Sequence, residues 1–450
     1  MSKNMLRFIS IVIISIIFIY AFSATYSSDS IDNISYVIAM AVDESEGENN
    51  LQVTFEFMDT SAFASDQGSE SNGGIVDTVT ATSINSALNL LNAYVGKSVN
   101  LSHCKVVVFS DKLAKKGISS EISALMNNIQ VRPSTNIIIC KGNALEYLQN
   151  STSQLEKILT KYYDIFPNSS EYTGYTSNIM IGEFYNYLTT KDCGNLAILG
   201  SLNPKISSAS GEQGGSSEGQ SSSEGSSEGS SSGSSEGGSS ESSSGSSKDS
   251  LKNNTTLTEM LAGNAPILGE RGTENIGLAV LKDGVYKGDL TASDTLCHTL
   301  ISGEVDSFLL SINNTELYKN YIDVSLFENT SPSVSVNVAG DTPEITIDIK
   351  LIGRIDSIKD GINYSDNSPE VDLDEISSAV SKSIKGYIIK YLEKTTSDFK
   401  CDLDYFYTYA KRNFLTLNDW KNYDWSSKYE KSKFNVNVEA HVYYSLLHTD

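Results

Sequence analysis

Apolar and polar residues follow two regular patterns over most of the 450-residue chain. Apolar residues at every second position are typical of a strand with one buried face, and apolar residues three and four apart are typical of a helix. Both patterns occur on each side of a long segment that has almost no apolar residue. The chain is therefore predicted to be an α/β protein of the α+β type, with several domains in which mixed sheets pack against helices.

The first half alternates strand and helix patterns. Ser83 and Gly96 frame one helical pattern as a cap and a stop, and Gly117 interrupts the next. We expect strands at 33–43, 50–59, 73–83, 104–110, 136–142 and 195–202, and helices at 83–96, 110–129, 143–150, 153–163 and 178–190. This order predicts an N-terminal α/β domain over residues 30–203.

The second half begins with a β-hairpin pattern that turns at Asp283–Gly284, because Asp-Gly between alternating apolar positions is a strong hairpin signal. Later segments predict two antiparallel strands at 333–340 and 344–355, a long helix at 369–399, further helix at 402–414 and a final strand at 434–447. The helix has an apolar stripe at three-to-four spacing, formed by Leu373, Ile376, Val380, Ile384, Tyr387, Ile388 and Tyr391. We expect a β-rich middle domain over 255–330 and an α+β C-terminal domain over 331–450.

Residues 204–254 are predicted to form a disordered linker. Within it, residues 207–250 are rich in Ser, Gly and Glu, and Ala209 is their single apolar residue. Such a composition cannot bury enough apolar surface to offset the entropy of ordering the chain. We therefore expect this segment to lie in a loop or between domains.

The N-terminus places Lys3 and Arg7 before an almost unbroken apolar run, Phe8–Phe22. As a helix this run would extend roughly 22 Å, which is short of a hydrocarbon core of about 30 Å. Residues 1–26 are predicted to be either a secretory signal sequence, cleaved near Ala21, or an uncleaved N-terminal membrane anchor. In both cases the rest of the chain would be exported, an orientation that the preceding positive charges favour.

The charge of the chain excludes some partners. With 33 basic and 56 acidic residues the net charge is −23. Nucleic-acid binding needs clustered Lys and Arg, so we expect no nucleic-acid partner. An anionic lipid surface would also repel such a chain, so membrane attachment would have to come from the apolar N-terminal segment.

The five cysteines, Cys104, Cys140, Cys193, Cys297 and Cys401, do not form close pairs. Their spacing argues against a structural zinc site, and their odd number argues against a complete disulfide framework. Two cysteines are next to histidines, Cys104 after His103 and Cys297 before His298. If a strand begins at Cys104, neighbouring side chains point to opposite faces, and neighbours on a helix diverge by about 100°. Neither pair is therefore expected to act as one site.

No GxSxG, HExxH, Walker-type or EF-hand motif occurs in the chain. We expect no enzyme activity and no catalytic, cofactor-binding or metal-binding residues. The acidic residues of 42–49 fit a turn, and those of 372–376 fit a helix start. A carboxylate pair of the glycosidase type stays open as an alternative.

Five tyrosines cluster near the predicted C-terminal helices: Tyr387, Tyr391, Tyr405, Tyr407 and Tyr409. They are either ordinary residues of the core and surface of amphipathic helices or part of a face that binds a partner.

Four stretches, taken in order, resemble the Ger(x)C family of spore germination proteins, the C subunits of nutrient germinant receptors. Residues 31–57 are similar to the strands that open the family pattern. Residues 101–118, 276–290 and 400–425 are similar to three further family segments. The matching positions are His103, Lys105, Val106, Val107, Ala114 and Gly117, then Gly277, Ala279, Val280, Lys282, Gly288 and Leu290, and finally Asp402 and Trp420. The resemblance covers most of the chain outside the linker.

The resemblance implies three α/β domains in a membrane-anchored, non-catalytic receptor subunit needed for germination. It would lie on the outer face of the spore inner membrane, with a large A-type subunit and a transporter-like B-type subunit as partners. No cofactor is implied, and direct nutrient binding stays open. Two alternatives from the residues are an extracytoplasmic solute- or cell-wall-binding protein and an exported hydrolase with a carboxylate pair.

The resemblance leads to two further expectations, one about lipid attachment and one about His103. Family members usually have a lipobox cysteine at the end of the signal peptide, and this chain has no cysteine before Cys104. We therefore expect anchoring by an N-terminal helix without lipid attachment. His103 matches the family histidine and is expected to position a turn at the entrance of a strand. Its replacement should destabilise the N-terminal domain, whereas Cys104→Val should be tolerated.

Overall fold

The computed structural model describes residues 3–23, 33–47, 51–58, 74–151, 159–203, 259–267, 271–312, 321–358 and 373–444. The linker expected over 204–254 lies outside these residues. Helix α1, Lys3–Ser23, contains the apolar N-terminal run, and side chains such as Phe8 and Ile17 are exposed on it. Within the described part of the chain, no helix combines the length and apolar character that a membrane crossing requires.

The N-terminal half alternates strands and helices, as the sequence predicts. Its elements are β1 Ile34–Glu44, β2 Leu51–Phe57, β3 Ile75–Ala81, α2 Ile84–Val95, β4 Ser98–Asn100, β5 Val106–Ser110, α3 Asp111–Lys116, α4 Ser119–Met126, β6 Asn136–Lys141, α5 Ala144–Asn150, α6 Leu159–Ile165, a 3₁₀ turn Phe166–Ser169, α7 Ser170–Thr173, α8 Ile181–Leu188 and β7 Asn195–Leu202. The cap at Ser83, the left-handed stop at Gly96 and the break at Gly117 are confirmed.

A nine-stranded sheet organises this half, in the order β3-β2-β1-β5-β6-β7-β8-β9, with β4 beside β1. The central strands β1, β5, β6 and β7 are parallel, and the outer strands are antiparallel. All five residues of β5 are buried, as expected for a parallel strand covered on both faces. The last two strands, β8 Thr273–Lys282 and β9 Val285–Leu290, come from beyond residues 204–254. They form the predicted hairpin, with positive φ at both Asp283 and Gly284.

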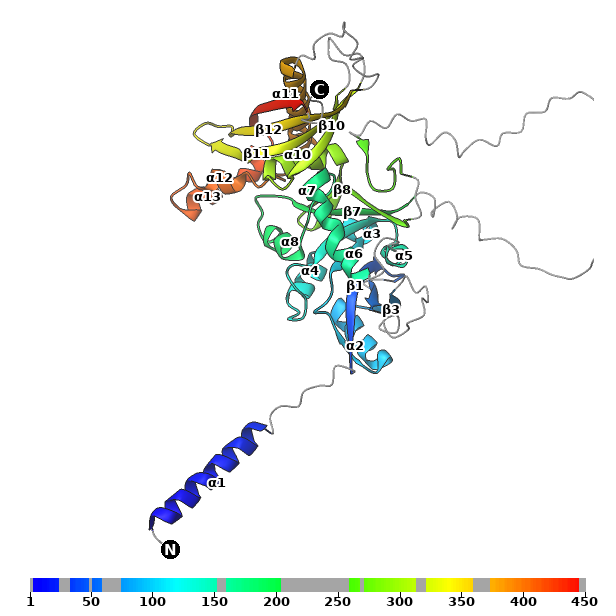
Figure 1. Cartoon of the computed structure of the whole chain (residues 1–450), viewed down its shortest axis with the longest axis vertical. Coiled ribbons are helices and arrows are strands. Elements are labelled where there is room, and N and C mark those ends of the chain that lie inside the picture. Colours follow the sequence, from blue (N-terminus) through cyan, green and yellow to red (C-terminus); the bar gives the residue numbers. More distant parts are fainter. Residues whose placement is uncertain are drawn as a thin grey trace, which may run out of the picture.

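A second, four-stranded sheet has the order β10-β11-β12-β13 (Figure 1). Its strands are β10 Ser307–Ile312, β11 Ile322–Asn337, β12 Glu344–Ile358 and β13 Lys433–Tyr444. The antiparallel pairing predicted for the two long strands is confirmed, and β13 adds parallel to β12. Helix α11, Leu373–Lys394, lies against β13, where Ser377 and Ser381 accept hydrogen bonds of 3.0 Å from the backbone of the strand. The mixed sheets packed with helices confirm the α/β class.

Helix α10, Ala292–Ser302, follows the last strand of the first sheet and leads to the first strand of the second. The C-terminal helices are α12 Tyr407–Lys411 and α13 Leu417–Tyr423, to the left of α10 in Figure 1, and α14 Trp425–Tyr429. Of the middle segment expected over 255–330, β8 and β9 extend the first sheet and β10 begins the second. The domain boundaries themselves stay predictions. Helix α10 and residues 400–425 therefore lie where the two sheets meet.

Two sequence predictions of element bounds are wrong. The strand expected from Cys104 begins at Val106, because residues 102–103 form a turn that Cys104 N–H closes on Leu101 O at 2.9 Å. The helix expected over 402–414 exists over Tyr407–Lys411, because the Asp402 carboxylate binds the backbone just before it. The long helix ends at Lys394 and closes with a π-helical turn over Thr395–Phe399.

Candidate functional site

The adjacent His103 and Cys104 are separated by the turn that precedes β5. The His103 ring is exposed and packs edge-on against Tyr36, with ring centroids 4.6 Å apart. The Cys104 side chain is buried, and its thiol lies 3.4 Å from the carbonyl oxygen of Val106. Burial raises the pKa of this thiol to about 12, so it is protonated at neutral pH. The two side chains do not form one site, and His103 lies in a turn as predicted.

The other four cysteines are also buried and free. Burial is the main cause that raises the pKa of each thiol, to about 12 for Cys401, further for Cys140 and Cys193, and well above the ordinary value for Cys297. A thiol must lose its proton to act as a nucleophile or a metal ligand. These cysteines therefore behave as small apolar core residues.

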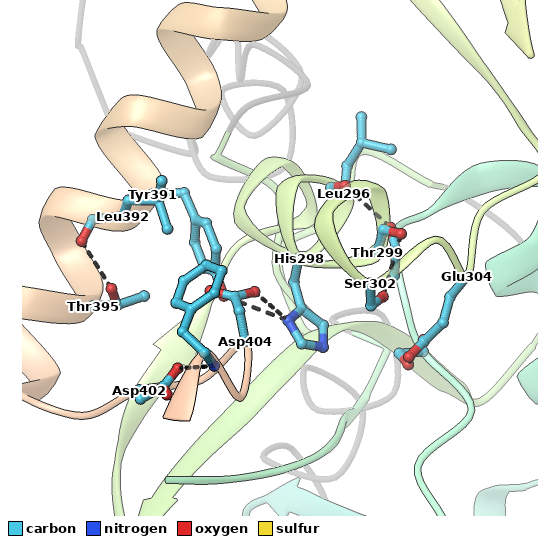
Figure 2. Close-up of polar contacts among 12 residues, drawn as sticks. Leu296, His298, Thr299, Ser302, Glu304, Tyr391, Leu392, Thr395, Asp402 and Asp404 are labelled. Atoms are coloured by element: carbon cyan, nitrogen blue, oxygen red, sulfur yellow. Dashed lines mark hydrogen bonds and ion pairs between the residues drawn. The ribbon is translucent and has the colours of Figure 1, made fainter. Parts of the chain in front are cut away.

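The second adjacent pair leads to a buried polar cluster at the junction of the sheets (Figure 2). His298 on α10 points toward the loop that carries Asp404, and its Nδ1 lies 2.8 Å from Oδ1 of that carboxylate. The hydroxyl of Tyr391, on α11, donates to the same oxygen at 3.0 Å. All three side chains are almost completely buried. Residues from three separate segments therefore meet at one carboxylate.

The charge state of His298 is determined by this partner. Burial alone would lower the pKa of the imidazole. The hydrogen bond and charge of Asp404, together with the charges of Glu304 and Asp402, outweigh burial and raise the pKa. His298 therefore holds a proton more readily than a free histidine does, and its 2.8 Å contact with Asp404 fixes the helix to the loop. Sequence reasoning missed this pair because its members are 106 residues apart.

Asp402, one of the family-like residues, organises the loop beside that pair. Its carboxylate accepts hydrogen bonds from Phe406 N–H at 3.1 Å, Tyr407 N–H at 2.7 Å and the Trp425 indole at 3.1 Å. Burial nevertheless raises the pKa of Asp402 to about 7, and these hydrogen bonds offset it only in part. Asp402 O also accepts Gly194 N–H at 2.9 Å, which ties the loop to the first sheet. The role of Asp402 is therefore to hold structure together.

Trp420, the second family-like residue of this region, makes a similar connection. Its indole donates to Asp192 at 2.9 Å, and its ring stacks near Trp425. Of the five clustered tyrosines, Tyr391 is buried in the core, and Tyr387, Tyr407 and Tyr409 are partly buried against it. Tyr405 is half-buried and stacks on Tyr187, with ring centroids 3.8 Å apart. The core interpretation therefore fits four of the five residues.

A small hollow of about 180 Å³ lies at the amino ends of β5 and β6. It is lined by Cys104, Lys105, Arg132, Ser134, Asn136, Asp164, Pro167, Asn178 and Met180. Lys105 and Asp164 form an ion pair of 2.7 Å across it. Its thiol is protonated, and its charged groups lack a histidine or a second carboxylate, so it does not resemble a hydrolytic site. Among the described residues, no three His, Cys, Asp or Glu side chains group as metal ligands.

Two family models match most of the chain outside the Ser/Gly/Glu-rich segment. A family model described as the spore germination protein N-terminal domain matches residues 27–203, and one described as spore germination B3/GerAC like, C-terminal, matches residues 276–445. YfkR of Bacillus subtilis (strain 168), a protein named for spore germination, is 25% identical over 130 residues, which is 28% of this chain and 34% of YfkR. The crystal structure of the GerBC protein is 12% identical, with a TM-score of 0.48, over 90% of this chain and 96% of that one.

Proposed function

The chain belongs to the GerAC-like family of spore germination proteins, and on that premise we propose that it is a membrane-anchored, non-catalytic subunit of a nutrient germinant receptor. The observation that carries the proposal is the extent of the family matches. They cover residues 27–203 and 276–445, and so include strands of both sheets and the junction between them. The unmatched residues are the N-terminal segment, the Ser/Gly/Glu-rich segment with its flanks, and the last few residues.

The buried chemistry supports a non-catalytic role. The described thiols are protonated, and His298 is already engaged by Asp404 away from solvent. Asp402 uses its oxygens for three hydrogen bonds within the fold. A hydrolase would need such groups at an accessible surface, within reach of a substrate. Their placement favours a subunit that presents surfaces over an enzyme that transforms a ligand.

Attachment to the membrane is the second part of the proposal. Helix α1 has exposed apolar side chains along its length, with Lys3 and Arg7 at its start. An apolar segment preceded by cations is typical of the N-terminal part that attaches an exported chain to a bilayer. We propose that this helix holds the chain on the outer face of the spore inner membrane, without a lipid, beside A-type and B-type subunits.

Deleting the gene in its own spore-forming host tests the receptor role. We expect the mutant spores to lose their response to at least one nutrient germinant, and the intact chain supplied in trans to restore it. The tagged chain should also co-purify with A-type and B-type subunits from spore membranes. Normal responses to all nutrients, with no co-purifying subunit, would reject the proposal.

Fractionation tests the attachment separately. The chain should stay with spore membranes after a high-salt wash, and a variant that lacks residues 1–26 should be released. Growth with labelled palmitate should leave the chain unlabelled. A labelled chain would show lipid attachment and contradict this part of the proposal alone.

A further inference from the structure

The chain enters the folded part from α1 at one end of the molecule, where β1 begins. Strand β1 starts at Ile34, and β4 pairs beside this start, with Ile34 opposite Ser98. Helix α2 lies at the same end, the lower end in Figure 1. Ten residues, 24–33, separate α1 from β1, and they can span at most about 36 Å. If α1 attaches to a bilayer, this end of the molecule must therefore lie close to it.

Large apolar side chains are exposed at this end. Leu90 and Tyr94 lie one turn apart on α2, at the flank of its buried stripe of Ile84, Ala87 and Leu91. Leu90 is 49% exposed and Tyr94 is 79% exposed. Ile129, in the turn that follows α4, is 98% exposed. Tyrosine and aliphatic side chains together are typical of a surface that meets the bilayer interface.

Two chain segments at this end are poor in acidic residues, although the chain as a whole is acidic, and Asp164 beside Arg132 in the hollow is paired with Lys105. Overall, 56 of 450 residues are acidic, or about one in eight. Residues 78–110 and 122–145 contain no Asp or Glu, and they include Lys97 and Arg132. Lys97 follows Gly96, the C-cap of α2, and Arg132 is three residues after Ile129. No described acidic side chain forms an ion pair with Lys97 or Arg132, whereas the neighbouring Lys105 pairs with Asp164.

Hydrogen bonds hold these loops in place. The Asn92 side chain of α2 accepts Val99 N–H at 2.8 Å, which fixes the loop that carries Lys97. The Gln130 side chain accepts Leu101 N–H at 3.1 Å, which fixes the turn that carries Ile129. The exposed groups are therefore presented on a preorganised surface, so binding would cost little ordering entropy.

We propose that this surface, formed by Leu90, Tyr94, Lys97, Ile129 and Arg132, lies against a bilayer that contains anionic lipids. The inference rests on the proposed attachment through α1, and it adds the orientation of the folded part. The apolar side chains enter the interface, and the two cations meet lipid phosphates. The remaining surface, including α11 at the top of Figure 1 and α12 and α13 at its upper left, then lies away from the membrane.

Site-specific fluorescence in vesicles tests this orientation. Bimane is attached to the full chain at Tyr94→Cys, Ile129→Cys or, as a control, Leu415→Cys, one variant at a time. The five native cysteines are buried, so the added cysteine is the one that reacts. Leu415 is a matched control, because it is a fully exposed apolar residue next to α13. The vesicles contain phosphatidylcholine and phosphatidylglycerol, with or without brominated acyl chains.

We expect bromine to quench the labels at positions 94 and 129 but not at 415. Replacing Lys97 and Arg132 with Gln should weaken the contact about fivefold per charge and reduce quenching accordingly. Flotation of the same samples reports attachment independently. A chain that floats with unquenched labels at 94 and 129 overturns the orientation and leaves the anchor intact. Equal quenching at 415 also overturns it, and a chain that does not float rejects the anchor and the orientation together.

Discussion

At the scale of single residues, several acidic groups are buried in a form that prefers to keep its proton. Glu56 on β2 is 2% exposed, and burial raises its pKa from 4.5 to about 7. The hydrogen bond from the Tyr163 hydroxyl, 2.9 Å long, offsets this only in part. The pKa of Asp402 is raised to about 7 for the same reason. Such groups bind protons more tightly in the folded state than in the unfolded state.

The sign of the resulting pH dependence is given by linkage. The stabilisation from protonated Glu56 is fully present below its ordinary value of 4.5 and is lost as the pH rises through about 7. We expect Glu56→Gln to flatten this loss and to raise stability above neutral pH by up to about 3 kcal/mol. Urea unfolding at several pH values measures it, with exposed Glu146→Gln as the control. An unchanged pH profile in Glu56→Gln would contradict the assignment.

The His298–Asp404 pair should be costly to break. Asp404→Asn keeps the size of the side chain but leaves the buried imidazole without its counter-charge. Removing one partner of a buried pair typically costs about 3–5 kcal/mol. We expect a loss of that size in urea unfolding. Because the pair raises the pKa of His298, its contribution is lost as the pH rises through that raised pKa, so the variant and the intact chain should converge at high pH. A cost that does not change with pH would argue against an ion pair.

In contrast to the costly Asp404→Asn, we expect a substitution of Cys104 to change the stability little. Its buried thiol has one weak contact, with Val106 O, and otherwise packs as an apolar side chain. A swap of similar volume in a core usually costs less than about 1.5 kcal/mol. Cys104→Val should therefore unfold close to the intact chain and leave germination unchanged. A loss of germination at normal stability would reveal a function for the thiol.

At the scale of elements, a strand glycine and a helix glycine have opposite roles. Gly277 in β8 has a φ of 87°, and an added Cβ would lie 2.4 Å from Leu290 O. Gly386 in α11 has no atom within 4 Å of such a Cβ. We expect Gly277→Ala to destabilise the chain by about 1–3 kcal/mol, and Gly386→Ala to stabilise it by up to about 1 kcal/mol. Thermal unfolding of both variants measures the contrast, and equal shifts would contradict it.

Local signals explain which elements the sequence could predict. Ser83 and Gly96 act within one helix, and Asp283 and Gly284 act within one turn, so their effects are visible in a few neighbouring letters. The prediction of a helix over 402–414 is wrong because Asp402 holds the backbone in a loop: its carboxylate accepts the Trp425 indole N–H, and its backbone carbonyl accepts Gly194 N–H. Long-range contacts of this kind leave no periodic pattern. The resemblance pointed to Asp402 and Trp420, but only the fold shows what they contact.

At the scale of the whole molecule, contacts between segments far apart in sequence hold the fold together. β7 and β8 pair side by side, although residues 204–254 separate them in sequence. The segment between α11 and β13 contacts the first half of the chain through Asp402–Gly194 and Trp420–Asp192. The composition of the sequence identifies residues 204–254 as a linker, but it does not show that β7 and β8, on either side of it, are neighbours in the sheet. The consequence is that the linker is an insertion between paired strands.

That connectivity predicts the result of cutting the linker. A protease that cleaves after glutamate should cut first among the six glutamates of 204–254, because the sequence there has almost no apolar residues to fold around. The two fragments should remain together in gel filtration, since seven residue pairs join β7 and β8 and the ties to Asp192 and Gly194 add to them. They should separate in urea, which serves as the control. Fragments that separate without denaturant would mean that the sheet does not continue across the insertion.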